Sequence, residues 1–290
     1  MVQTKIASPI ACVRGYNGNM KIFLPIIALL LASSPVSSSA EDGTSLSLAF
    51  QREVIRRLDV PQQAQAHYAQ LLKAALASAG IPAMKSQYVL MADRNPNVQA
   101  IFVYWLDARA SPGRSHFIGA SPASTGKPNK YNHFITPLGV FAHTLDNKDF
   151  RAEGTLNGFG IRGMGRKGMR AYDFGWTLGE RGWGRSGLSQ MRLLMHTTDP
   201  DYLEHLLGKA MSKGCIRIPA TLNTFIDRYG LLDGDYEQAL ASGKKFWVIR
   251  PDRTPTPWSG RYLVIVDSGS IQRPAWSPEP AGITPPGIAN

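Results

Sequence analysis

Short apolar runs separated by turn residues are the feature that most limits how this 290-residue chain can fold. Three such runs occupy 87–93, 98–107 and 116–121, with Pro-, Gly- or Asn-containing breaks at 95–97 and 111–113. Runs of this length between turn residues predict the strands of an antiparallel meander. The sequence therefore favours a mostly β (α+β) chain, and a hydrophobic fraction of 43% is enough to bury a core.

Further elements follow from the same patterns. Helices are expected at 61–79, before Gly80, and at 219–229, between Pro219 and Gly230. A short helix is expected at 201–207. Additional strands are predicted at 139–144, 190–197, 215–218, 246–250 and 262–267. The resulting class is a β core with flanking helices.

A glycine-rich stretch lies at 151–189 and contains eleven glycines together with Trp176 and Trp183. It is too rich in glycine for regular elements and too aromatic for a simple linker. We expect a long structured loop that covers a site. Its excess of arginine fits either a solvated face or a basic lid above an anionic ligand.

The first forty residues are typical of an export signal. Basic residues precede a short apolar run at 22–32, and small residues follow up to Ala40. Eleven apolar residues are too few to span a bilayer, which needs about 20. We therefore expect a signal at 1–40, no membrane span after its cleavage, a helical extension at 41–84, a main domain at 85–268 and a proline-rich tail at 269–290.

Removal of the signal would leave Cys215 as the single cysteine, because Cys12 lies inside it. A thiol becomes a strong nucleophile when an imidazole can take its proton. His196 ends a predicted strand nineteen residues before Cys215, so a return strand could bring the two together. Gly214 permits a close backbone approach, and its amide with that of Cys215 could hold an oxyanion.

Arg217 is two residues beyond Cys215, so on a strand both side chains point the same way. A guanidinium beside a nucleophile suits a substrate carboxylate. Simpler explanations remain open at this point: a buried packing cysteine, a structural histidine and a surface ion pair.

Two ordered motifs resemble the YkuD-type L,D-transpeptidases of bacterial cell walls. The first is His196 followed by Ser212-Lys213-Gly214-Cys215-Ile216-Arg217, and the second is Ser-Thr-Gly-Lys at 124–127 with Thr-Pro-Leu-Gly-Val-Phe at 136–141. The resemblance covers about 87–267. Lys213 stands where the family usually has a second histidine. The resemblance implies a β-sandwich or barrel catalytic domain with a lid loop.

The resemblance also implies a reaction and a location. Cys215 would attack the carbonyl of the third residue of a peptidoglycan tetrapeptide and expel D-alanine, and His196 would move the proton. The Thr197 carbonyl would orient the imidazole. The implied substrate contacts are Arg217, Ser212, Lys213, Trp176 and Trp183. Donor and acceptor stems would be the partners, in the periplasm, without cofactor or metal.

Two other functions fit the same residues. An L,D-carboxypeptidase or endopeptidase would use water as the acceptor, and a non-catalytic wall-binding protein would have lost activity through Lys213. The histidines at 116, 133, 143 and 205 could suggest a metal site with His196, but they lack metal-binding spacing. The net charge of +11 favours polyanions, yet export disfavours nucleic acid.

Overall fold

The computed structural model describes residues 38–81, 85–110, 113–185 and 187–280. Of the predicted export signal at 1–40, only 38–40 fall within these ranges. The last part of the proline-rich tail, 281–290, lies outside them. None of the helices in the described ranges is long and apolar enough to cross a bilayer.

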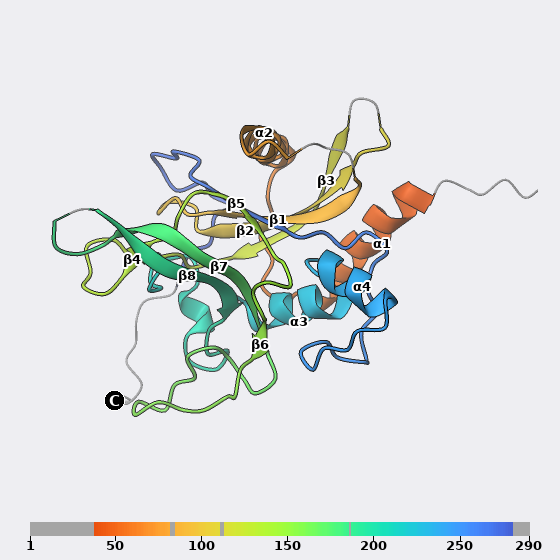
Figure 1. Ribbon diagram of the computed structural model, residues 1–290. Helices are drawn as coiled ribbons and strands as arrows, with labels where there is room; N and C mark the ends of the chain where they lie inside the picture. Colours follow the sequence, from red (N-terminus) through yellow and green to blue (C-terminus); the bar gives the residue numbers. More distant parts are fainter. Residues whose placement is uncertain (1–37, 82–84, 111–112, 186, 281–290) are drawn as a thin grey trace, which may run out of the picture. The chain divides into compact units, whose positions relative to one another are not determined.

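Two five-stranded sheets form the core (Figure 1). The first, sheet A, has the order β3 (Arg114–Pro122), β2 (Ala100–Asp107), β1 (Gln87–Asp93), β10 (Tyr262–Val266) and β5 (Gly139–Ala142). The second, sheet B, has the order β4 (Phe134–Ile135), β7 (Arg170–Arg181), β8 (Leu188–Thr197) and β9 (Ile216–Ile218), and β6 (Phe150–Arg151) also pairs with β7. The antiparallel meander β1–β2–β3 is confirmed.

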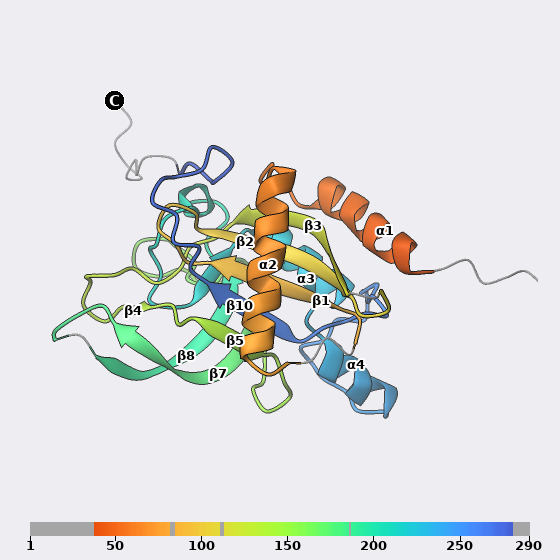
Figure 2. The ribbon, with the colours of Figure 1, turned by 90° about the horizontal axis from the view of Figure 1, so that it is seen from above.

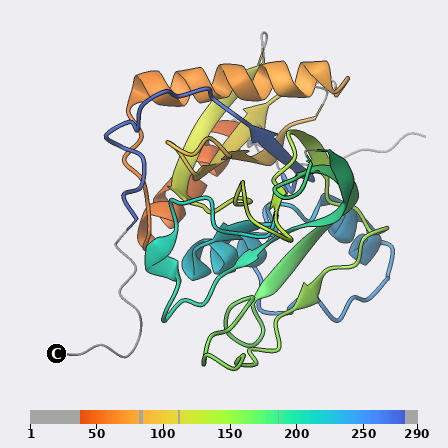
Figure 3. The same cartoon turned by 90° about the vertical axis from the view of Figure 1, so that its left-hand side faces the viewer.

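The helices cover both faces of sheet A. Helix α2 (Gln62–Ser78) crosses one face and buries Tyr68, Leu72 and Leu76, which share one side at helical spacing (Figure 2). The other face packs on sheet B, α1 (Ser38–Glu53) and α3 (Ala220–Tyr229), so α2 and α3 lie on opposite sides of sheet A (Figure 3). Because both faces are covered, β1 is almost continuously buried rather than alternating.

The coarse fold class is confirmed: the chain is mixed α/β with two sheets and few helices. Neither sheet closes into a barrel within the described residues. The predicted helix at 219–229 is confirmed, and it ends at Gly230 in the left-handed conformation (φ 60°). The short helix near 201–207 is a single 3-10 turn, Glu204–Leu206.

The prediction of one loop from 151 to 189 is wrong for the twelve residues of β7. Gly175 takes a φ of +84° at the point where the β7–β8 register shifts, so this glycine makes a bulge instead of breaking the strand. A side chain there would strike Asn147. Irregular backbone prevails between β6 and β7, at 152–169, and in the shorter connection between β7 and β8, where 182–185 are described.

The predicted strand at 246–250 is also wrong, because the Ile249 amide donates to the Phe246 carbonyl and closes a turn. Helix α4 (Gly234–Ala241) was not predicted, whereas most of α1 falls in the helical extension predicted at 41–84. Helix α1 forms where its apolar side packs, with the Phe50 ring edge-on to Phe225 at 5.3 Å. Such tertiary contacts outweigh a weak local helix signal.

A buried ion cluster joins the end of sheet A to sheet B and to α3 and α4. Arg170, which is fully buried, donates to Asp149 (2.7 Å), Asp233 (2.7 Å) and Asp227 (3.2 Å). His143 Nε2 lies 2.7 Å from Asp149 and its Nδ1 lies 2.8 Å from the Leu232 carbonyl. Arg151, Arg253 and Glu237 complete the cluster, which holds four carboxylates, three guanidiniums and one imidazole.

Both nitrogens of His143 face acceptors, so the ring is an imidazolium that balances the cluster's charge. Burial alone would lower the pKa of His143, but the Asp149 carboxylate outweighs burial and holds this pKa above its ordinary value. Because the folded-state pKa exceeds the unfolded one, the charged ring stabilises the fold fully below about pH 6.5. This stabilisation is lost as the pH rises through the folded-state pKa.

We expect His143→Gln to lower the free energy of unfolding by about 2 kcal/mol at pH 6, since it removes a charged hydrogen-bond partner. Urea unfolding at several pH values measures this. The difference between wild type and variant should shrink as the pH rises through the His143 pKa. The exposed His205→Gln serves as the control and should change little. Equal stability of His143→Gln and wild type at pH 6 would contradict a charged ring.

Candidate active site

The candidate site lies where β8 and β9 run side by side. These strands are parallel, and His196 is in register with Arg217. Met195, Ile216 and Ile218 face the core, so His196 and Arg217 face the opposite side of sheet B. Cys215 immediately precedes β9 and, two residues from Arg217, belongs to the same side. The structure therefore places the three predicted key residues on one face.

The imidazole ring of His196 is oriented by the backbone of the next residue at the end of β8. Its Nδ1 lies 2.6 Å from the Thr197 carbonyl, the contact that the family resemblance implied. An N–H must point at that carbonyl, so Nδ1 carries the proton and Nε2 presents a lone pair. Burial lowers the pKa of His196 to about 4, with the Arg217 charge adding to the effect. The ring is therefore neutral at pH 7 and can accept a proton.

The Cys215 thiol is half-buried, and its Sγ lies 3.9 Å from the Arg192 carbonyl. Burial raises the pKa of this thiol, whereas the Leu194 amide and the Arg217 charge act in the opposite direction. Among the described residues no hydrogen bond joins Sγ to His196. The resting site thus pairs a neutral thiol with a neutral imidazole.

Arg217 is half-buried, and its guanidinium has no hydrogen-bond or ion-pair partner within the described part of the chain. Its backbone is fixed by two bonds to Ser124, at 2.9 and 3.0 Å. Ser124 belongs to the second motif of the family resemblance, so the fold brings the two motifs together. An unpaired guanidinium beside a thiol is a place for an anionic group.

The turn that carries the thiol is built from buried contacts. Ser212 is buried, and its Oγ donates to the Cys215 carbonyl (2.5 Å) and accepts from the Gly214 amide (3.0 Å). Gly214 has a φ of +128°, and a side chain there would meet Met191 at 2.8 Å. Ser212 therefore shapes the turn and is not presented to a substrate. The Gly214 amide is already engaged, which leaves the Cys215 amide as the better oxyanion donor.

The other three predicted substrate contacts have different surroundings. Lys213 is exposed. Trp176 is 65% exposed and stands in register opposite Arg192, on the same face as the thiol. Trp183 packs edge-on against Phe134, with ring centroids 5.0 Å apart. Lys213 and Trp176 are available for contact, whereas Trp183 belongs to a half-buried aromatic cluster.

The glycine-rich loop at 152–169 reaches the base of the site. Thr197 Oγ1 donates to the Met164 carbonyl (2.8 Å), and the Arg162 amide donates to Asp199 (2.7 Å). At Gly165, where φ is +89°, a side chain would lie 1.9 Å from Thr197 Oγ1. The loop therefore supports the residue whose carbonyl orients His196.

Three residues of the site were missed from the sequence. Asp173 is fully buried near the thiol, and Arg192 binds it at 2.7 Å through Nε. His133 is also buried; burial lowers its pKa, and the nearby charges of Lys213 and Arg217 lower it further. Strand alternation with His196 could have indicated Arg192. His133 was considered only as a metal ligand with His196, and nothing local marks Asp173, because other segments bring both residues to the site.

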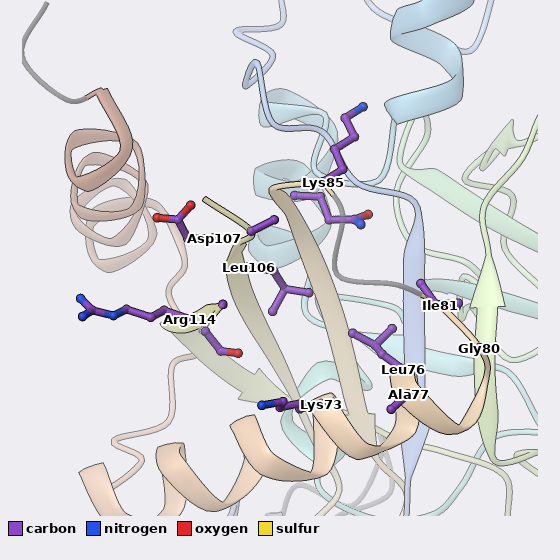
Figure 4. A pocket seen from close by; sticks show the side chains of 13 residues that line it. Lys73, Leu76, Ala77, Gly80, Ile81, Lys85, Leu106, Asp107 and Arg114 are labelled. Carbon is purple, nitrogen blue, oxygen red and sulfur yellow. The ribbon is translucent and has the colours of Figure 1, made fainter. Parts of the chain in front are cut away.

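A cavity of about 460 Å³ lies elsewhere, between the end of α2 and the ends of β1–β3 (Figure 4). Leu76, Ile81 and Leu106 line it, with Lys73 and Arg114 at its edge. It contains none of the residues around Cys215. Nowhere in the described ranges do three or more His, Cys, Asp or Glu residues gather as metal ligands.

Comparison with models of known protein families and with curated proteins found no match for this chain. The site is therefore interpreted from its own chemistry. A thiol, a neutral imidazole with a fixed tautomer and an unpaired guanidinium on one sheet face together suit nucleophilic attack on a carbonyl next to an anionic group.

The thiol's electrostatics can be tested by alkylation with iodoacetamide as a function of pH. We expect the rate to rise with a midpoint above about 8.5, the ordinary thiol pKa, because burial disfavours the thiolate. Arg217→Gln should move the midpoint still higher, since it removes a charge that stabilises the thiolate. Arg114→Gln, at an exposed position on β3, should leave the midpoint unchanged. A midpoint below 7 would reveal a preformed thiolate and contradict this description.

Proposed function

We propose that this chain is an L,D-transpeptidase, a cysteine acyltransferase that cross-links peptidoglycan stem peptides. The observation that carries the proposal is the register of β8 and β9, which aligns His196 with an unpaired Arg217 two residues from Cys215. The Thr197 carbonyl at 2.6 Å from Nδ1 supports a role for His196 as base. We also propose that 85–268 is the family's catalytic domain and that the chain acts in the periplasm.

In the first step, Cys215 Sγ attacks the carbonyl carbon of the third residue of a tetrapeptide stem. The thiol proton passes to His196 Nε2, and the carbonyl oxygen becomes an oxyanion near the Cys215 amide. The carbon–nitrogen bond then breaks, and the departing D-alanine amine takes the proton from His196. The product is a thioester on Cys215.

In the second step, an amine from another stem attacks the thioester carbon. His196 accepts the amine's proton, the carbon–sulfur bond breaks, and the thiolate recovers the proton. Because His196 is neutral at pH 7 and its tautomer is fixed, the same nitrogen serves both steps. Arg217 would bind a stem carboxylate and so set the position of the reacting carbonyl.

The direct test is mass analysis of peptidoglycan tetrapeptide fragments incubated with the protein. We expect cross-linked dimers that have lost one D-alanine, and none with Cys215→Ala. The variant should unfold in urea much like wild type, since Cys215 is only half-buried and the hydrogen bond from its Sγ to the Arg192 carbonyl is long, at 3.9 Å. Tripeptide monomers without dimers would show water as the acceptor and a hydrolase instead. No Cys215-dependent product would contradict the proposal and favour a wall-binding protein.

The pH dependence of kcat/KM tests the base. We expect kcat/KM to fall as the pH drops through about 4, where His196 becomes protonated. Assays from pH 3 to 8, with unfolding monitored in parallel, measure this. An acid limb near 6.5 would contradict the buried, neutral imidazole.

A further inference from the structure

A second arginine lies on the other side of the thiol from Arg217. Along β8, Arg192, Leu194 and His196 alternate onto one face, and His196 is in register with Arg217. Continuing that register places Leu194 beside Cys215. Arg192 and Arg217 therefore lie on opposite sides of the thiol along the strand direction, each about 6.6 Å away in strand rise.

The Arg192 guanidinium is oriented by a buried partner. Its Nε and Nη2 both contact Asp173 Oδ2, at 2.7 and 2.5 Å. Asp173 is itself fixed, because its Oδ1 accepts the Gly175 amide (2.8 Å) inside the β7 bulge. The side chain of Arg192 remains 46% exposed, and within the described residues Nη1 has no partner. Asp173 thus occupies one edge of the guanidinium and leaves the other edge open.

The surface next to Arg192 combines exposed apolar side chains with the polar Gln190 and Glu180, which lie on the same face of the β7–β8 pair. Trp176 stands opposite it across the β7–β8 pair and is 65% exposed. Leu178 and Leu188 continue the same face and are 56% and 65% exposed. Aromatic and aliphatic surface beside an open guanidinium edge suits a peptide that carries a carboxylate.

We propose that Arg192 forms a second carboxylate subsite, so that the donor is a peptide with a free carboxylate on each side of the scissile carbonyl. This inference rests on the proposed function and specifies its substrate. Arg217 binds one carboxylate, and the open edge of Arg192 binds the other. A carboxamide at the second position keeps one oxygen acceptor, but it replaces the other with an N–H donor and removes the negative charge, so the two-pronged, charge-assisted contact with the guanidinium is lost.

The test uses three synthetic tetrapeptide donors: one with both carboxylates free, and two in which one or the other is a carboxamide. We expect wild type to prefer the diacid in kcat/KM over each monoamide by at least about 10-fold, the effect of one charge-assisted hydrogen bond. Arg192→Gln should reduce one of these two preferences to below about 2-fold and retain the other. The matched control Arg185→Gln, an exposed arginine in the β7–β8 turn, should keep both preferences.

Binding of the same peptides to Cys215→Ala, with and without Arg192→Gln, separates this inference from the proposed reaction. Arg192-dependent preference in calorimetric titration, without D-alanine release by wild type, would support the subsite and overturn the transpeptidase. Turnover with both preferences unchanged in Arg192→Gln would overturn the subsite and leave the transpeptidase intact. Failure of all three peptides to bind Cys215→Ala would overturn the subsite.

Discussion

The charge balance around Arg170 is the interaction on which the rest of the structure depends. This guanidinium is fully buried and pairs with three carboxylates that come from three separate segments. Removing one partner from such a cluster would leave an uncompensated buried charge, which typically costs about 3–5 kcal/mol. Asp149 extends the cluster toward the thiol, because its Oδ1 accepts the Asp173 amide at 2.9 Å. The ions therefore fix both sheet B and the residue that orients Arg192.

The electrostatics of the site differ from those of the cluster. The cluster keeps its charges because each is paired, whereas the thiol and imidazole lie in a buried setting that favours their neutral forms. Attack then requires transfer of the proton as the carbon–sulfur bond forms. The Arg217 guanidinium lies beside the thiol and the imidazole and lacks a partner in the described part of the chain, so a substrate anion would satisfy it.

The sequence predicted elements with strong local signals, but it failed where distant contacts decide the structure. The strands at 87–93 and 98–107 and the helix at 219–229 carry clear apolar patterns and turn residues. The run at 246–250 looked like a strand, yet a turn forms there and its Phe246 packs against Tyr236. Strand β7 was not predicted because its segment is rich in glycine. The strand tolerates Gly175 because this residue lies in a β-bulge. In the site, the contact of His196 with the Thr197 carbonyl was expected from the family resemblance. Alternation along β8 could have indicated Arg192, whereas its pairing with Asp173 depends on the β7–β8 register, which local patterns did not provide.

The turn that holds Cys215 has a consequence for how the protein acquires reactivity. Its backbone is held by hydrogen bonds to Ser124, Thr125 and Thr136, which lie roughly eighty to ninety residues earlier in the chain. Closing so long a loop is entropically costly and belongs to the slow part of folding. The nucleophile thus gains its geometry only when the whole intervening segment is in place. A chain cut between 127 and 212 would keep every chemical group of the site, and assembly of the site would then depend on association of two fragments.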